Sequence, residues 1–155
     1  QYHLVKALKE NCHGLDFELT LIGLANGDYL KAIRNLGVPF KHFNHMPHAD
    51  VLTKISEHDV LCLNSLEDGF GMVVTEALSL GVPVAVSQNA GASELITRCG
   101  GGVVFDPLDP SSTINAITAC LCGDFKLQSE PLPSWREYAT ELTQTIGFGL
   151  AGVRA

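Results

Sequence analysis

The chain has 155 residues, which suits one domain with a sizeable core, and hydrophobic residues make up 46% of it. With 17% charged residues and a formal net charge of −7, neither a disordered chain nor a nucleic-acid partner is expected. No apolar run approaches the roughly 20 residues that a membrane-spanning helix needs.

Hydrophobic patterning predicts helices that alternate with short apolar strands. In chain order we expect a helix over 1–12, a strand over 17–22, a helix over 28–36, a strand over 38–43, a helix over 49–57, a strand over 60–63, a helix over 72–80, a strand over 82–87, a helix over 92–99, a strand over 102–105 and helices over 112–121 and 134–146. The runs 60–63 and 82–87 are typical of strands buried on both faces. Trp135 and Tyr138 are expected to pack on the last helix, and 147–155 to form a frayed tail.

This alternation predicts an α/β domain over residues 1–146, a doubly wound Rossmann-like parallel sheet with helices on both faces. The first strand is central in many such sheets, yet this chain opens on a helix at Gln1. Either the fold begins differently, or a strand before Gln1 is missing and the chain is a piece of a larger protein.

Cysteine and histidine patterns do not indicate disulfides or a metal. Reduced thiols of a cytosolic protein are the expected reading because five cysteines occur at irregular spacings: Cys12, Cys62, Cys99, Cys120 and Cys122. His42, His45 and His48 recur every three residues, but the segment passes from strand into loop at Pro47 and no acid or cysteine completes a ligand set. We therefore predict no metal site.

The loop 64–71 follows the strand 60–63, at the sheet edge where doubly wound folds bind ligands. Gly69 and Gly71 allow the backbone to turn sharply, and the free N–H groups of the following helix would attract a phosphate. Asp68 lies in the loop and Glu76 in the first turns of the helix, so both carboxylates can face one cavity and accept hydrogen bonds from sugar hydroxyls. The alternative is a plain turn with a solvated Glu76.

The wider pattern consists of an acid and a Glu eight residues later around Gly-Phe-Gly at 69–71, then Gly-Val-Pro-Val at 81–84 and Gly-Ala-Ser-Glu at 91–94. Together with "LTLIG" at 19–23 and "GGGVVFDPLDP" at 100–110, it resembles the family-four retaining glycosyltransferases, also called group 1 glycosyltransferases. The resemblance covers nearly the whole chain and implies the C-terminal half of a GT-B fold. Asn64 stands where family members commonly have Pro.

The resemblance also implies roles for individual residues. Asp68, where the family usually has Glu, would contact the donor sugar, and Glu76 would hold the ribose; these two are the catalytic candidates. Glu67 could compete with Asp68, and Glu94 would hold the turn at Gly91. The implied donor-binding set is Glu67, Gly69, Phe70, Gly71, Met72 and Val73, with Asn44, His45 and Met46 beside the base.

The implied donor is a nucleotide sugar (a UDP-, GDP- or ADP-sugar), transferred with retention to an acceptor hydroxyl without a metal or other cofactor. No Lys or Arg of this chain matches the family's basic diphosphate ligands, and the N-terminal domain that carries the acceptor site is absent. We therefore expect the chain alone to be inactive, and the full-length enzyme to be cytoplasmic or associated with a membrane. The alternatives are a GT-B-fold epimerase or phosphorylase, and a non-catalytic glycosyltransferase-like module acting through protein contacts.

Overall fold

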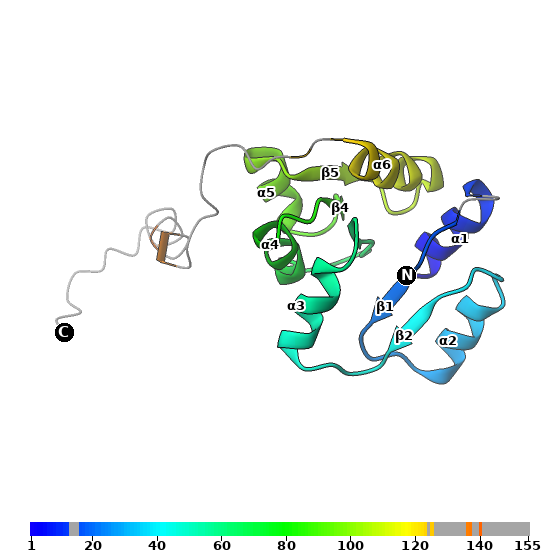
Figure 1. Cartoon of the computed structure of the whole chain (residues 1–155). Coiled ribbons are helices and arrows are strands. Elements are labelled where there is room, and N and C mark those ends of the chain that lie inside the picture. The colour runs from blue at the N-terminus through cyan, green and yellow to red at the C-terminus, as the bar shows by residue number, and fades with distance from the viewer. Residues whose placement is uncertain (13–15, 124, 126–135, 138–139, 141–155) are drawn as a thin grey trace.

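The computed structural model describes residues 1–12, 16–123, 125, 136–137 and 140. The elements are α1 (Tyr2–Asn11), β1 (Thr20–Ile22), α2 (Gly27–Arg34), β2 (Lys41–Phe43), α3 (His48–Ser56), β3 (Leu61–Leu63), α4 (Met72–Ser79), β4 (Val84–Ser87), α5 (Ala92–Cys99), β5 (Gly102–Phe105) and α6 (Pro110–Cys122) (Figure 1). The predicted alternation is thus confirmed as far as α6. Trp135, Tyr138 and the tail lie outside the described residues, as does most of the predicted helix 134–146.

The predicted α/β class with parallel strands is confirmed, but the strands form two sheets, β1–β2 and β3–β4–β5. Alternate residues of a parallel strand direct their backbone groups to opposite edges. In β1 the odd positions bond to β2, because Lys41 N–H donates to Leu19 O and Gly23 N–H donates to Phe43 O. The backbone groups of Thr20 therefore point to the other edge, where no described strand pairs with β1.

The larger sheet is covered by helices on both of its faces. Within β4, Val84 and Val86 join a cluster with residues of α3, α4 and α5, whereas Ala85 packs with Phe105 and with α6. All four residues of β4 are buried, as predicted for a strand covered on both faces. β3 is only partly buried, contrary to expectation. It pairs with β4 alone, so its second edge lacks a neighbouring strand among the described residues.

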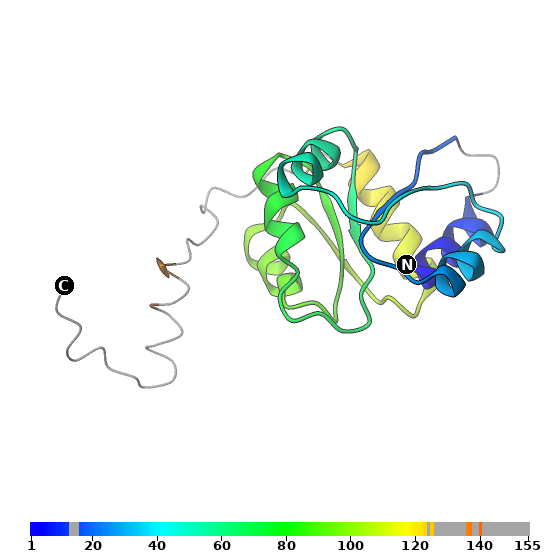
Figure 2. The same ribbon diagram turned by 90° about the horizontal axis from the view of Figure 1, so that it is seen from below.

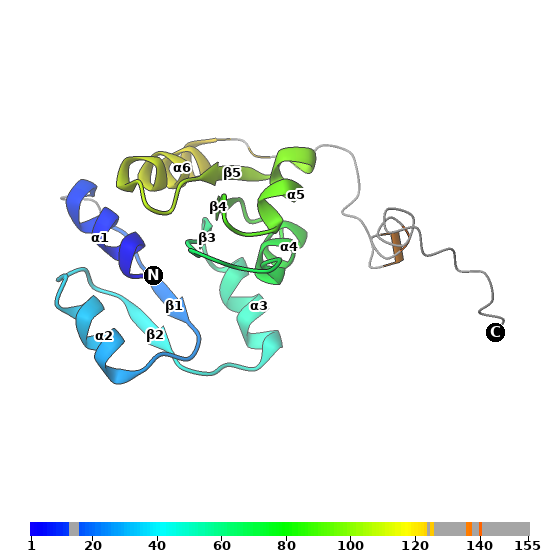
Figure 3. The same cartoon turned by 180° about the vertical axis from the view of Figure 1, so that it is seen from behind.

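The smaller sheet has a smaller core, formed by Val5, Leu21, Ile33 and Val38. The helix α1 also contacts α6, and Figures 1 and 3 both show these helices side by side. Viewed from below, α6 lies between the larger sheet and the elements of the smaller one (Figure 2). The packing of α1 against α6 is therefore one connection between the two sheets.

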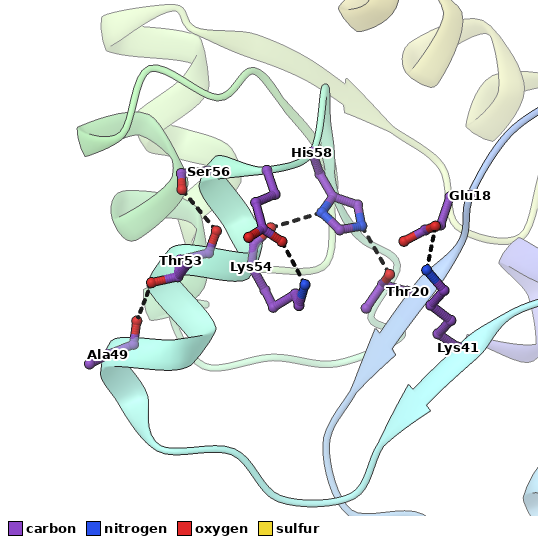
Figure 4. A network of polar contacts seen from close by, with 9 residues as sticks. Glu18, Thr20, Lys41, Ala49, Thr53, Lys54, Ser56 and His58 are labelled. Atoms are coloured by element: carbon purple, nitrogen blue, oxygen red, sulfur yellow. Dashed lines mark hydrogen bonds and ion pairs between the residues drawn. The ribbon is translucent and has the colours of Figure 1, made fainter.

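A polar connection lies at the amino ends of β1 and β3. His58 Nδ1 donates to Lys54 O at 2.8 Å, which leaves Nε2 to accept from Thr20 Oγ1 at 2.9 Å (Figure 4). Nearby, Lys41 Nζ lies 2.6 Å from Glu18 Oε2, and this hydrogen bond lowers the pKa of Glu18. Among the described residues, no helix is long and apolar enough to cross a membrane.

Candidate functional site

The loop between β3 and α4 turns sharply at Gly71. Its φ of 81° is left-handed, a conformation that side chains with a Cβ rarely adopt. A Cβ at this position would also lie only 2.6 Å from Leu63 Cδ2. The left-handed φ therefore favours glycine here, and its turn sets the direction in which α4 starts.

The same loop is fastened to the connection between β4 and α5. Asp68 N–H donates to Asn89 O at 3.3 Å, and Ala92 N–H donates to Phe70 O at 2.7 Å. A Cβ on Gly91 would lie 2.4 Å from Gly69 O, so the two backbones approach as closely as only glycine permits. The Gly-Ala-Ser-Glu motif at 91–94 therefore supports the candidate site by allowing this contact.

Glu94 was expected to hold the turn at Gly91, and its carboxylate does not do so. The residue is exposed, and its side chain makes no hydrogen bond with another described residue. Its backbone N–H, rather than its carboxylate, donates to Gly91 O at 3.3 Å. The turn is held by main-chain contacts.

Backbone donors gather where α4 begins. The first N–H groups of a helix have no partner within the helix. The N–H groups of Gly69, Gly71, Met72 and Val73 donate to no other described residue. These groups, together with the helix dipole, favour an anion at the start of α4. Met72 is exposed, and Val73 packs against the core of the larger sheet.

Along the chain, Asp68 precedes these backbone donors and Glu76 follows them. Asp68 is half-buried and its carboxylate makes no hydrogen bond within the described residues, while Glu67 beside it is exposed. The Glu76 side chain is 23% exposed, and its Oε1 lies 2.9 Å from His48 Nε2. A cavity of about 50 Å³ lies at the carboxyl end of β1, lined in part by Gly23 and His42, and none of the predicted site residues lines it. A common cavity for the two acids stays a prediction.

Two of the three histidines at three-residue spacing make separate contacts. His42 Nε2 donates to Gly23 O at 2.9 Å, and His48 Nε2 contacts Glu76. Within the part of the chain that the structure describes, no three His, Cys, Asp or Glu side chains are placed to hold a metal ion.

The loop Asn44–Met46 lies between β2 and α3, two residues before His48. Asn44 and His45 are exposed and Met46 is half-buried. Because His48 contacts Glu76, the structure brings this loop near the start of α4. Sequence reasoning missed the contact, although His48, Val51 and Ile55 share the spacing of one helix face.

One amide near the site has no partner. The Nδ2 of Asn64, directly after β3, is fully buried and forms no hydrogen bond with the described residues. Such an orphaned donor costs roughly 1–3 kcal/mol.

The cysteines are free thiols, as predicted. Burial raises the pKa of Cys62 to about 12 and that of Cys120 to about 11. Both thiols are protonated at neutral pH, and a thiol in that state is a poor nucleophile. These two cysteines are therefore packing residues.

Comparison with known proteins identifies a matching family and several relatives. A family model described as "Glycosyl transferases group 1" matches residues 1–141. The O-antigen chain mannosyltransferase B of Escherichia coli is 32% identical over 100 residues, which are 64% of this chain and 23% of that protein. An uncharacterized glycosyltransferase of Methanocaldococcus jannaschii is 31% identical over 114 residues, 71% of this chain and 29% of that protein. The chain thus spans less than a third of these curated relatives.

Solved structures agree on the fold. WaaG, a glycosyltransferase involved in lipopolysaccharide biosynthesis, matches with a TM-score of 0.69 at 21% identity, over 78% of this chain and 34% of that chain. A sucrose-phosphate synthase from Thermosynechococcus elongatus matches with a TM-score of 0.63 at 22% identity, over 77% of this chain and 33% of that chain. Both neighbours have the GT-B fold.

Proposed function

Because this chain belongs to the group 1 glycosyltransferases, we propose that it binds the nucleotide-sugar donor for retaining transfer of a sugar to an acceptor hydroxyl. The observation that carries the proposal is a set of N–H groups that donate to no described residue, at the start of the helix that carries Glu76: those of Gly69, Gly71, Met72 and Val73. Such donors suit the diphosphate of a nucleotide sugar.

Each part of the donor has a group of suitable chemistry. The second oxygen of Glu76, which makes no hydrogen bond within the described residues, would accept from the ribose hydroxyls. The unpaired carboxylate of Asp68 would accept from the donor sugar, with exposed Glu67 beside it. The loop Asn44–Met46 would border the base. The donor would therefore extend from the loop after β2 to the loop after β3.

In the intact enzyme the bond between the sugar and the diphosphate would break as the acceptor oxygen bonds to the sugar carbon, and the proton of the acceptor hydroxyl would pass to the departing diphosphate. The departing diphosphate gains negative charge, which the N–H groups at the start of α4 would stabilise. We propose that no metal is required, and that basic diphosphate ligands and the acceptor site come from protein outside this chain. On this proposal the chain alone binds a donor and does not transfer the sugar.

Calorimetric titration of the chain with UDP-, GDP- and ADP-sugars tests the proposal. Glu76→Ala should weaken binding about tenfold or more, because it removes a charged hydrogen-bond acceptor. Glu10→Ala is the matched control, since Glu10 is an exposed acid on the distant helix α1. A folded chain that binds none of the three sugars, or equal weakening by both variants, would contradict the proposal.

A second candidate is a non-catalytic glycosyltransferase-like module that acts through protein contacts. The observation that favours it is the second edge of β1 and of β3, where no described strand pairs. Sheet edges of this kind can accept a strand from another protein. The same titration separates the two candidates, because the module need not bind a nucleotide sugar.

A further inference from the structure

A histidine contacts the acid to which the proposed function assigns the ribose. His48 Nε2 lies 2.9 Å from Glu76 Oε1, although the two residues are 28 positions apart. An ionised carboxylate only accepts hydrogen bonds, so Nε2 carries the proton and donates it. We propose that His48 is a positioning residue, which orients the Glu76 carboxylate for the ribose of the donor; this inference rests on the proposed function.

Apolar packing directs His48 toward α4. His48, Val51 and Ile55 occupy one face of α3, since residues three and four apart are neighbours on a helix. Ile55 is buried in a cluster with Val74 and Ala77 of α4, and Val51 packs against that cluster. The imidazole therefore lies at one end of a row of α3 side chains whose other members, Val51 and Ile55, pack against α4.

The two side chains differ in exposure in a way that suits this role. The His48 side chain is 69% exposed and that of Glu76 is 23% exposed. The imidazole thus covers one side of the carboxylate at the surface, and the pair stays within reach of a ligand. His48 occupies Oε1, whereas Oε2 accepts no hydrogen bond from a described residue.

A carboxylate that is already held in its binding conformation binds a ligand more tightly than a mobile carboxylate does. Ordering a long side chain such as glutamate costs conformational entropy. Where a hydrogen bond from His48 already orders it, this cost falls on folding and not on binding. The predicted effect of His48 is therefore specific to the ligand group that Glu76 contacts, namely the ribose hydroxyls.

The experiment measures the affinities of UDP, GDP and ADP for the chain by calorimetry, and then of the 2′,3′-dideoxy form of the diphosphate that binds best. His48→Ala should weaken binding of the ribose form about tenfold, because the Glu76 side chain would then have to be ordered when the ligand binds. It should change binding of the dideoxy form by less than about twofold. His48→Gln should restore most of the affinity, because the amide can still donate to the carboxylate. His3→Ala is the control, an exposed histidine in the first turn of α1.

The outcomes separate this inference from the proposed function. If Glu76→Ala weakens binding and His48→Ala does not, the inference is overturned and the donor site stands. Equal weakening of the ribose and dideoxy forms by His48→Ala would also overturn it, since the histidine would then act on another part of the ligand or on the fold. If neither variant changes an affinity, or no diphosphate binds to wild type, both proposals fall.

Discussion

The two sheets of this protein differ in the depth of their cores. Around β4 twelve buried residues form one cluster, whereas four form the cluster beside β1. Every residue of β4 is buried, but only the central residue of β1 is. The candidate acids, the glycine turn and the backbone donors belong to the larger unit, and the smaller unit leads into the loop Asn44–Met46. The proposed contacts with diphosphate and ribose thus involve the unit with the larger core.

The largest change in stability is expected when the contact between Gly91 and Gly69 in the larger unit is disrupted. Gly91→Ala places a Cβ 2.4 Å from Gly69 O, and we expect a loss of about 3 kcal/mol in the free energy of unfolding. Chemical denaturation measures this loss. Gly27→Ala is the control, because its Cβ meets nothing within 4 Å and its φ is not left-handed. A loss below about 0.5 kcal/mol for Gly91→Ala would contradict this prediction, because the loop backbone would then move away from the added Cβ at little cost.

Alkaline pH should weaken the larger unit through the half-buried thiol of Cys62 and the buried thiol of Cys120. Unfolded Cys62 and Cys120 ionise from the ordinary value of 9.0, whereas the folded pKa values are raised to about 12 and about 11. The unfolded state therefore releases protons first, and stability present below pH 9 is lost as the pH rises toward 12. We expect a loss on the order of 2 kcal/mol by pH 10 in denaturant titrations.

Two variants separate the thiol effect from general alkaline unfolding. Cys62→Ala should reduce the difference in stability between pH 7 and pH 10. Cys122→Ala should leave that difference unchanged, because Cys122 is exposed. An equal pH dependence in Cys62→Ala and wild type would mean that the Cys62 thiol does not contribute.

Hydrogen exchange compares the local stability of β1 with that of β4. Amide protons in elements with few buried contacts exchange through local opening, which costs less than global unfolding. The amide of Leu21 in β1 should therefore exchange about tenfold or more faster than that of Ala85 in β4. Exchange followed by NMR measures both in one sample. Equal protection would mean that the two sheets open together.

The smallest expected effect concerns the polar connection between the units. Thr20→Val removes the hydroxyl that donates to His58 Nε2 while keeping a similar shape. We expect a loss of about 1 kcal/mol in the free energy of unfolding, the usual contribution of one hydrogen bond. Thr97→Val is the control, because its hydroxyl bonds within α5 to Ser93 O. Equal losses in both variants would indicate that the hydrogen bond between Thr20 and His58 stabilises the protein no more than a hydrogen bond within a helix does.

Local patterns in the sequence predicted the order of elements well, and the bounds of α5 and β5 agree with the prediction residue for residue. Gly91 and Gly100 flank α5, and Gly101 precedes β5, which ends before Asp106 and Pro107. The division into two sheets was not predictable in the same way, since apolar periodicity identifies a strand without identifying its neighbours. The expected strand 38–43 is shorter in the structure, where β2 begins at Lys41.

The candidate site was predictable where its geometry is local. The turn at Gly71 and the position of Glu76 on α4 follow from residues close together in the chain. The contact of His48 with Glu76 and the approach of Gly91 to Gly69 join segments more than 20 residues apart. Such contacts depend on how helices and loops pack, which the spacing of motifs does not express. The ligand roles of these residues stay predictions.

The fastening of the loop 64–71 to the β4–α5 connection has a consequence for molecular recognition. Hydrogen bonds at Asp68 and Phe70 hold the backbone of this loop to that connection. A ligand docking there would meet a template of fixed shape, so little conformational freedom is left to be lost on association. A rigid loop of this kind would not adapt to a ligand of different stereochemistry. Small stereochemical differences at the bound group would therefore change the dissociation rate.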